Sequence, residues 1–451
     1  MDCAPPRGCA PRASKGALTV VGDEPYLPYD RPPLSKTVLA GRVPVDHTPL
    51  PRFRTLESVE WVLGVAAAEL ELARNQVVLA DGRAIAFDRL LIATGTRARP
   101  WHDAEQARLD GVFTLRGRDD AEKLRRSLEA RPRRVLVIGA GFTGSEVASV
   151  CRELGLPVTV VERSAAPLVG ALGRTIAGRA AELQREHGVD LRCEVQVEAL
   201  EGDAQGRLRR ARLSDGSTVE AEVAVVALGA IRNIEWLGDS CLAVGPFGVA
   251  CDAGCRAIDV NFVVTDDLFV AGDIARFPHP LYRQQFLSLE HWGNAVEQGA
   301  IAAHNMVCPP TRRRPHLAVP EFWSSQFGVN IKSVGVPSAA DEVMIVQGSL
   351  EEGRFVAAYG RDGRIVAAVS FDRGRWIEFY ARLIEQGAEF PLEMATGEGR
   401  PLGPAVPAGF PDAAVVREHA TAILTGHDPD TRRVKLVPRR PRESPCAKRA
   451  S

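Results

Sequence analysis

Short apolar runs that close on a glycine turn recur along the chain, and such runs predict buried strands. Residues 18–21 lead into Gly22-Asp23, residues 89–93 lead into Thr94-Gly95, and residues 267–271 lead into Gly272-Asp273. Open α/β sheets place their ligand crevices just beyond such strand ends. The pattern therefore predicts several strands whose ends face a common binding region.

The middle of the chain alternates between strand and helix patterns. Residues 134–138 and 158–161 are typical of strands, whereas residues 119–129, 144–154 and 174–187 have helical periodicity. Residues 189–230 are rich in strand signals. Strands that alternate with helices imply a parallel, doubly wound sheet, so the predicted fold class is α/β.

Beyond residue 308 the pattern changes again. Residues 309–320 are basic and rich in proline, which predicts a linker. Hairpin-like strands and then a helix over about 373–385 indicate a separate α+β domain. A further helix is predicted over residues 411–424, ahead of a basic end that we expect to be a solvated tail. A contact with an acidic partner is the alternative for that end.

A GxGxxG motif follows the strand at 134–138 and opens the next helix. Gly139 would allow the tight turn, Gly141 would let the backbone approach a pyrophosphate, and Gly144 would let helix and strand pack closely. Phe142 and Thr143 complete the motif, and the start of the helix would face the phosphates. The alternative is a structural glycine turn that binds no ligand.

Glu162 ends the next strand, 18 residues after Gly144. Its carboxylate would accept hydrogen bonds from a ribose 2′-hydroxyl and repel a 2′-phosphate. We therefore expect NADH rather than NADPH. Arg163 stands beside this acid and weakens that preference, because a nearby arginine can accommodate a 2′-phosphate.

Composition narrows the function classes. The 451 residues allow about three domains. The 56 basic and 57 acidic residues argue against a nucleic-acid or polybasic membrane binder. No apolar run approaches the roughly 18 residues that would span a bilayer, and residues 1–17 hold no apolar signal-peptide segment. Nine scattered cysteines do not resemble a disulfide framework, so we expect a cytoplasmic protein with reduced thiols.

Six stretches, in order, resemble one known family. They are VGDEPYLPYDRPPLSK (21–36), LLIATGTRARP (90–100), VIGAGFTGSEVA (137–148), VAGDIARF (270–277), EHWGNAVEQG (290–299) and PEFWSSQFG (320–328). Over about residues 17–390 the chain resembles the FAD-dependent, NADH-linked ferredoxin reductases that serve cytochrome P450 and dioxygenase systems. This putidaredoxin reductase type is a branch of the pyridine nucleotide–disulfide oxidoreductase superfamily.

The resemblance implies two interleaved Rossmann-like dinucleotide-binding domains and a C-terminal α+β domain. The FAD-binding domain would comprise residues 1–111 and 232–311, with the NAD-binding domain inserted as residues 112–231. Residues 312–395 would form the C-terminal reductase domain, and residues 396–451 the tail.

The resemblance also implies roles for individual residues. Lys36 and Glu146 would pair near flavin N5 and the nicotinamide, and these two are the expected catalytic residues. The remaining FAD contacts would come from side chains and turns that match the family at Asp23 (ribose), Arg31, Ala67 (near the adenine), Thr94, Gly95, Arg116, Asp273 and Trp292 (beside the isoalloxazine). Gly229, in a further glycine turn, is also an expected cofactor-binding residue.

The implied reaction is hydride transfer from NADH to FAD, followed by single-electron transfer to a ferredoxin-type iron–sulfur protein. No metal site is implied. Dithiol reductases of the wider group keep a cysteine pair beside the flavin, but PPLSK here has none, and Cys251 and Cys255 are interpreted as incidental thiols. An NADH oxidase is an alternative, and the sequence does not indicate an oligomeric state.

The chain departs from the family at its start. Gly139 precedes Glu162 by 23 residues, and the same spacing before Asp23 falls off the sequence. We therefore expect the first FAD strand and its GxGxxG loop to be missing, through a misplaced start or a frameshift. The rival is a truncated, non-catalytic remnant that binds NADH but little or no FAD. Smaller departures are Arg232 for a usual proline and Ser325 for a usual aspartate.

Overall fold

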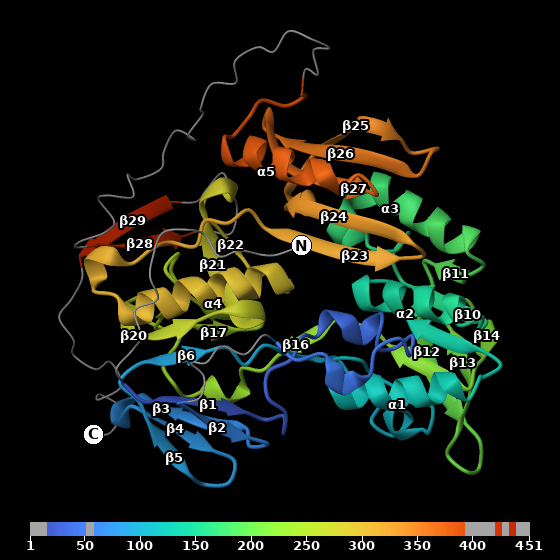
Figure 1. Cartoon of the computed structure of the whole chain (residues 1–451), viewed down its shortest axis with the longest axis horizontal. Coiled ribbons are helices and arrows are strands. Elements are labelled where there is room, and N and C mark those ends of the chain that lie inside the picture. The colour runs from blue at the N-terminus through green and yellow to red at the C-terminus, as the bar shows by residue number, and fades with distance from the viewer. Residues whose placement is uncertain (1–15, 51–57, 393–419, 426–432, 439–451) are drawn as a thin grey trace.

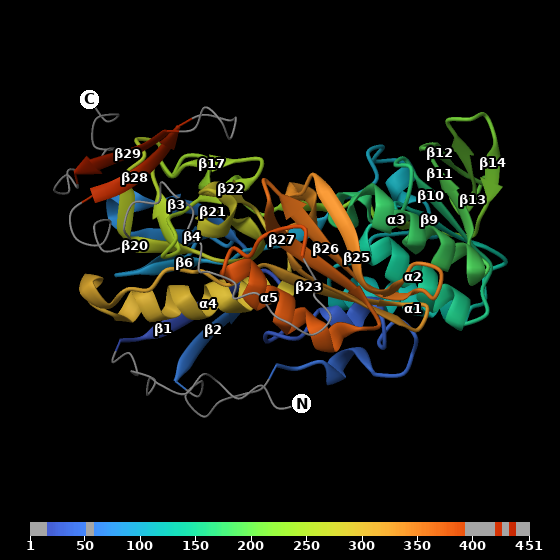
Figure 2. The same ribbon diagram turned by 90° about the horizontal axis from the view of Figure 1, so that it is seen from above.

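The structure is a computed structural model that describes residues 16–50, 58–392, 420–425 and 433–438. Three sheet-containing regions meet in it (Figure 1). The blue and yellow region contains α4, the green and teal region contains α1 to α3, and the orange region contains α5. Seen from above, the orange sheet lies between the other two regions (Figure 2).

The green and teal region is built on a five-stranded parallel sheet in the order β11-β10-β9-β15-β8. Its elements are β8 (Val112–Phe113), α1 (Arg118–Glu129), β9 (Val135–Ile138), α2 (Phe142–Glu153), β10 (Val158–Glu162), α3 (Val169–Glu186), β11 (Asp190–Cys193) and β15 (Val223–Val226). All four residues of β9 are buried, as the apolar run predicts for a central parallel strand. A small antiparallel sheet is attached, formed by β12 (Val197–Gly202), β13 (Leu208–Leu213) and β14 (Thr218–Glu220).

The direction of the strand order changes between β9 and β15. From β9 the chain passes through α2 to β10 on one side, while β15 and β8 lie on the other side. In open α/β sheets the crevice at such a switch point is where ligands bind. The GxGxxG turn follows β9 at this crevice.

The blue and yellow region has its parallel strand pairs in three separate sheets. β1 (Leu18–Gly22) pairs with β2 (Val59–Leu63), β6 (Leu90–Ile92) with β20 (Val264–Val270), and β18 (Gly248–Ala250) with β21 (Ala275–His279). The other strands are β3 (Ala67–Glu71), β4 (Gln76–Leu79), β5 (Ala84–Ala86), β7 (Thr96–Ala98), β16 (Ala230–Arg232), β17 (Val244–Gly245), β19 (Arg256–Ile258) and β22 (Gln285–Leu287). The long helix of this region is α4 (Trp292–Val307).

Side chains from the β1–β2 pair and the β6–β20 pair share one core although these pairs lie in separate sheets. Val62 of β2 and Ile92 of β6 belong to the same buried cluster. Among the described residues β1 pairs with β2 alone and β6 with β20 alone. The missing first strand of the FAD domain stays a prediction, and this split of the parallel sheet is consistent with it.

The orange region is an antiparallel sheet in the order β23-β24-β27-β26-β25. Its elements are β23 (Glu321–Gln326), β24 (Val329–Gly335), β25 (Glu342–Ser349), β26 (Arg354–Arg361), β27 (Arg364–Phe371) and α5 (Ile377–Glu385). Both faces of the sheet are covered. One face shares a core with Leu172 and Ile176 of α3, and the other packs against Tyr380 and Ile384 of α5.

Two local predictions differ from the structure. The helix predicted over 411–424 is wrong for its last residues, because β28 (Ala420–Thr425) is a strand that pairs with β29 (Arg433–Pro438). Thr421, Ile423 and Thr425 alternate as β-branched residues there, which favours a strand. Residues 411–419 lie outside the described residues. In the predicted linker, Arg313 is nearly buried and pairs with Asp266, so this segment is anchored.

Helix α3 begins before the predicted residue 174 and is kinked. Gly173 has φ 71° and ψ 165°, which interrupts the helical backbone. At this kink the Tyr359 hydroxyl of β26 donates a hydrogen bond of 2.6 Å to the Leu172 carbonyl. Burial raises the pKa of Tyr359, so the phenol stays protonated and can donate.

No helix in the described part of the chain is long and apolar enough to cross a membrane.

We predict that Tyr359→Phe lowers the free energy of unfolding by about 1–3 kcal/mol, because a buried carbonyl at the kink loses its donor. Tyr380→Phe is the matched control, since the Tyr380 hydroxyl has only a 3.3 Å hydrogen bond from Gln347. Chemical denaturation of both variants measures the effect. Equal losses in the two variants would contradict the importance of the α3 contact.

Candidate functional site

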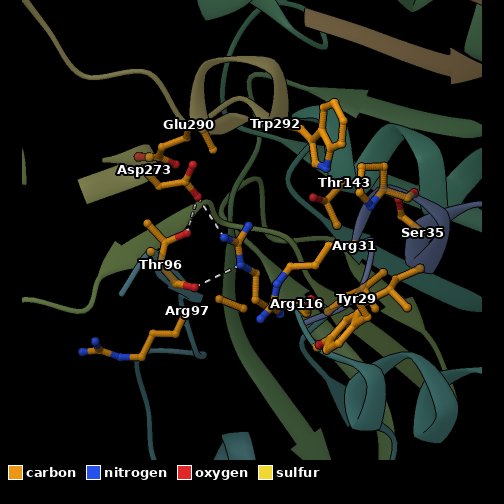
Figure 3. A pocket seen from close by; sticks show the side chains of 18 of the residues that line it. Tyr29, Arg31, Ser35, Thr96, Arg97, Arg116, Thr143, Asp273, Glu290 and Trp292 are labelled. Carbon is orange, nitrogen blue, oxygen red and sulfur yellow. Dashed lines mark hydrogen bonds and ion pairs between the residues drawn. The ribbon is translucent and has the colours of Figure 1, made fainter. Parts of the chain in front are cut away.

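A cavity of about 790 Å³ lies where the three regions meet (Figure 3). Its volume falls within the range of about 300–1,000 Å³ that is typical of ligand pockets. It collects most of the predicted site residues, namely Asp23, Arg31, Lys36, Thr94, Gly95, Arg116, Phe142, Thr143, Glu146, Asp273 and Trp292. The predicted residues that do not line it are Ala67, Gly139, Gly141, Gly144, Glu162 and Gly229.

Asp273 stands at one side of the cavity and is held by two donors. Thr96 Oγ1 donates to Asp273 Oδ2 over 3.0 Å, and the Arg116 guanidinium donates to the same oxygen over 2.8 Å. Arg116 Nε also donates to the Thr96 carbonyl, which closes the triangle seen in Figure 3. The three side chains therefore form one rigid polar group.

Helix α4 fixes the backbone beside Asp273. The Gly272 amide donates to Gln298 Oε1 over 2.8 Å, and Gln298 is fully buried. Gly272 has φ 79° and lies against Ala295, so this turn requires glycine. The EHWGNAVEQG stretch thus supports the Asp273 turn as well as supplying Trp292.

Arg232, which replaces a usual proline of the family, also supports this turn. It donates to the Asp273 carbonyl over 3.2 Å and to Ser288 Oγ and Glu290 Oε1 over 2.8 Å each. Burial raises the pKa of Glu290, and the pairing with Arg232 opposes this rise. At this departure from the family, Arg232 forms an ion pair with Glu290 and a hydrogen bond to the Asp273 turn.

Lys36 and Glu146 meet in the lining of the same cavity. Lys36 Nζ lies 2.7 Å from Glu146 Oε2, and Ser35 Oγ donates to the same oxygen over 2.5 Å. The other oxygen, Oε1, accepts a 2.6 Å hydrogen bond from Ser324 of β23. The structure brings the two expected catalytic residues together, and it adds two serines that sequence reasoning missed.

Arg31 lines the cavity, but its charge is engaged with neighbouring groups. Its guanidinium pairs with Glu24 at 2.5 Å and lies over the Tyr29 ring at 4.9 Å. The Tyr29 hydroxyl donates to the same glutamate. This cluster fixes the loop that leads to Lys36.

Aromatic rings form one wall of the cavity. Trp292 and Trp323 are half-exposed and meet edge to face at 5.5 Å between ring centroids. Phe142 packs edge to face against Phe322 at 4.7 Å, and His291 stacks on Phe322. Burial lowers the pKa of His291, which favours the neutral ring. Such a wall suits a planar ligand.

The glycines of the GxGxxG turn differ in how much space surrounds them. A Cβ on Gly139 would lie 2.5 Å from the Ala227 carbonyl oxygen, and one on Gly144 would lie 2.0 Å from the Gly139 carbonyl oxygen. Gly141, in contrast, has no atom within 4 Å of the Cβ position and an unstrained φ of −70°. The outer glycines therefore pack the turn, and the middle glycine leaves space for a ligand.

Glu162 is fixed beside this turn. Its Oε2 accepts a 2.7 Å hydrogen bond from the Ala140 amide, and its Oε1 accepts a 2.8 Å hydrogen bond from the Ser164 amide. The carboxylate thus stands at the end of β10, next to the glycine turn that begins at Gly139. The glycine turn and Glu162 together form a second candidate binding site. This site adjoins the cavity, because Phe142 and Thr143 line the cavity.

Cysteines take no part in the described lining of the cavity. Cys251 and Cys255 are buried, and burial raises their pKa values, that of Cys255 to about 12, so both thiols are poor nucleophiles. This agrees with their interpretation as incidental thiols. Cys241 is disulfide-bonded, which corrects the expectation of reduced thiols at that position.

A glycine turn at a sheet switch point beside a large polar and aromatic cavity defines a two-site dinucleotide-binding oxidoreductase fold. The chain belongs to the pyridine nucleotide-disulphide oxidoreductase family, whose model matches residues 9–299. A second model, the reductase C-terminal domain, matches residues 321–405.

Relatives place the chain among the ferredoxin reductases of P450 and dioxygenase systems. Rhodocoxin reductase of Rhodococcus erythropolis is 34% identical over 342 residues, which is 75% of this chain and 77% of that protein. The ferredoxin–NAD(+) reductase component of the biphenyl dioxygenase system of Paraburkholderia xenovorans is 32% identical over 391 residues, 86% of this chain and 91% of that protein. The covalent putidaredoxin reductase–putidaredoxin complex matches with a TM-score of 0.77 at 28% identity, over 83% of this chain and 88% of that one.

We predict that alanine substitutions at two glycines of the turn have opposite effects. Gly144→Ala should lower the free energy of unfolding by about 1–3 kcal/mol or more, because its Cβ collides with backbone. Gly141→Ala should leave unfolding nearly unchanged and weaken NADH binding at least about tenfold, equivalent to about 1.4 kcal/mol. Denaturation and NADH titration measure the two effects. Tight NADH binding by Gly141→Ala would show that no phosphate approaches this glycine.

Proposed function

We propose that this chain is a flavoprotein reductase that takes hydride from NADH onto FAD and passes single electrons to a ferredoxin-type iron–sulfur protein. The observation that carries the proposal is the convergence of the Lys36–Glu146 pair and the Asp273 cluster on one cavity. That cavity adjoins the glycine turn at the start of α2. The FAD would supply the hydride acceptor and the split into single electrons.

The residues present fit the ring and ribityl parts of FAD. The aromatic wall of Trp292 and His291 suits a flat ring, while Asp273 offers a fixed acceptor for ribityl hydroxyls. Asp23 lines the same cavity, and its carboxylate would accept hydrogen bonds from a ribose. Ala67 lies on β3 outside this lining, and its role near the adenine stays a prediction.

The residues at the second candidate binding site fit NADH. Helix α2 begins at Phe142, and its first amides and positive dipole end favour a pyrophosphate. Gly141 leaves open space at that point. The carboxylate of Glu162 would accept the ribose hydroxyls and repel a 2′-phosphate, so we propose NADH over NADPH.

Lys36 would act as a fixed positive charge at the wall of the cavity. Its ammonium is held by Glu146, whose side chain is only 7% exposed and is itself held by two serines. A charge held in place before the reaction stabilises negative charge that develops nearby without a cost of reorganisation. Lys36 would therefore favour electron-rich states of a ring bound in the cavity.

A second candidate function is a protein that binds NADH but little or no FAD. The observation that favours it is the split parallel sheet, because β1 pairs with β2 alone among the described residues. Binding of FAD decides between the two functions.

The test uses the full purified chain, incubated with FAD and then desalted. The proposal predicts a bound flavin spectrum that NADH bleaches without oxygen, and cytochrome c reduction that depends on an added ferredoxin-type iron–sulfur protein. A protein that stays colourless and still binds NADH would instead support the second function. Oxygen consumption that needs no ferredoxin would identify an NADH oxidase.

We predict that Lys36→Met slows anaerobic flavin reduction by NADH at least about tenfold, because the fixed charge is lost. Lys123→Met is the matched control, since Lys123 is exposed on α1 and does not line the cavity. Stopped-flow absorbance measures the rate constant in both variants. Equal rates in the wild type and Lys36→Met would remove Lys36 from the mechanism.

A further inference from the structure

We propose that Ser324 of the C-terminal sheet is a positioning residue that orients Glu146 toward Lys36. In this way the C-terminal region would set the geometry of an ion pair formed by two other parts of the chain. The kinetic consequence rests on the proposed function, whereas the geometric one does not.

The alternation of β23 brings Ser324 to the buried face of the strand. Phe322, Ser324 and Gln326 are buried, while Trp323 and Ser325 point the other way. Ser324 is 1% exposed and does not line the cavity, so it reaches the cavity only through Glu146. This arrangement distinguishes it from residues that could touch a ligand.

Hydrogen-bond direction defines what Ser324 does. Gln326 Nε2 donates to Ser324 Oγ over 3.0 Å, so the serine oxygen already accepts one hydrogen bond. A hydroxyl has a single proton to donate, and Ser324 donates it to Glu146 Oε1 over 2.6 Å. The two hydrogen bonds therefore form a chain in which Gln326 donates to Ser324 and Ser324 donates to Glu146.

The two carboxylate oxygens are held from opposite ends of the chain. Oε2 contacts Lys36 and Ser35, and Oε1 contacts Ser324, 178 residues further along than Glu146. A carboxylate with both oxygens fixed cannot rotate about its last bond without losing a partner. Ser324 thereby prevents a rotation that would turn Oε2 away from the ammonium of Lys36.

A second contact holds the same strand against the same helix. The Phe327 amide, just after β23, donates a 2.7 Å hydrogen bond to Ser149 Oγ, three residues after Glu146 on α2. The contact between β23 and α2 thus has two anchors one helical turn apart. Ser324 is the anchor that reaches the ion pair.

The first test measures the ion pair directly, in the full chain and without any cofactor. Lys36 acetylation by limiting acetic anhydride is followed by mass spectrometry, with Lys123 as the internal reference. Ser324→Ala should raise the relative labelling rate of Lys36 several-fold, up to about tenfold, because a charge-assisted hydrogen bond that orients its partner is lost. Glu146→Gln removes the negative charge of the ion pair, so the labelling rate of Lys36 in this variant sets the upper limit for the effect.

Ser333→Ala is the matched control. Ser333 lies on the neighbouring strand β24, is 1% exposed, and has a hydroxyl with no hydrogen-bond partner. Ser333→Ala removes a buried hydroxyl from the same sheet as Ser324→Ala does, but this hydroxyl does not contact Glu146. Lys36 labelling should therefore stay at the wild-type rate. Gln326→Met should act in the same direction as Ser324→Ala with a smaller effect, since the serine keeps its proton.

The second test is the rate constant of anaerobic flavin reduction by NADH. Ser324→Ala should lower this rate constant about tenfold, because a charge-assisted hydrogen bond that orients Glu146 is lost. Ser333→Ala should leave the rate constant unchanged. Thermal unfolding of all variants shows whether they fold.

The possible outcomes separate this inference from the proposed function. Wild-type protein that NADH does not reduce would end the proposed function, while Lys36 labelling would still decide the role of Ser324. Wild-type labelling in folded Ser324→Ala would overturn the inference. Equal changes in Ser324→Ala and Ser333→Ala would also overturn it, because a loosened sheet would then explain both. If Ser324→Ala fails to fold, wild-type labelling in Gln326→Met overturns it as well.

Discussion

The structure depends on a buried carboxylate that three regions of the chain must satisfy. Glu146 is nearly excluded from water, and an isolated charge there would be strongly unfavourable. Lys36 neutralises it, while Ser35 and Ser324 complete its hydrogen bonds. Removing a partner would leave a buried charge unpaired, so the loop before β2, helix α2 and strand β23 are bound to one geometry. The cavity exists where these three elements meet.

Close backbone packing is the second constraint, and it fixes the other binding feature. Gly139 and Gly144 bring β9, β15 and α2 within carbonyl contact, where no side chain fits. The same contact aims the start of α2 toward the region reached by Phe142 and Thr143, which line the cavity. Glu146 lies one turn after Phe142 on α2, so the same helix begins at the glycine turn and contributes to the ion pair with Lys36. A single helix therefore fixes the position of both features.

Local sequence patterns predicted the parts of the molecule that local physics determines. The apolar runs located β1, β9 and β20, and the glycine spacing located the turn before α2. The pairing of Lys36 with Glu146 came only from the family resemblance. Contacts such as that of Thr96 with Asp273, 177 residues away, leave no local pattern, so they could not be derived. The helix predicted over 411–424 was wrong over 420–424 for the same reason, because pairing with β29 overrides helical periodicity.

The two dinucleotide features differ in how their strands are supported. The turn after β9 follows the central strand of a five-stranded parallel sheet, and β9 has a hydrogen-bonded neighbour on each side. Asp23 follows β1, which pairs only with β2 among the described residues, whereas Asp273 is held independently by Thr96, Arg116 and the turn at Gly272. The turns proposed for NADH and for the flavin ring therefore lie on well-supported elements, whereas Asp23, proposed for the ribose of FAD, follows a strand with a single described neighbour. Affinity for FAD and affinity for NADH should consequently be separable properties of this chain.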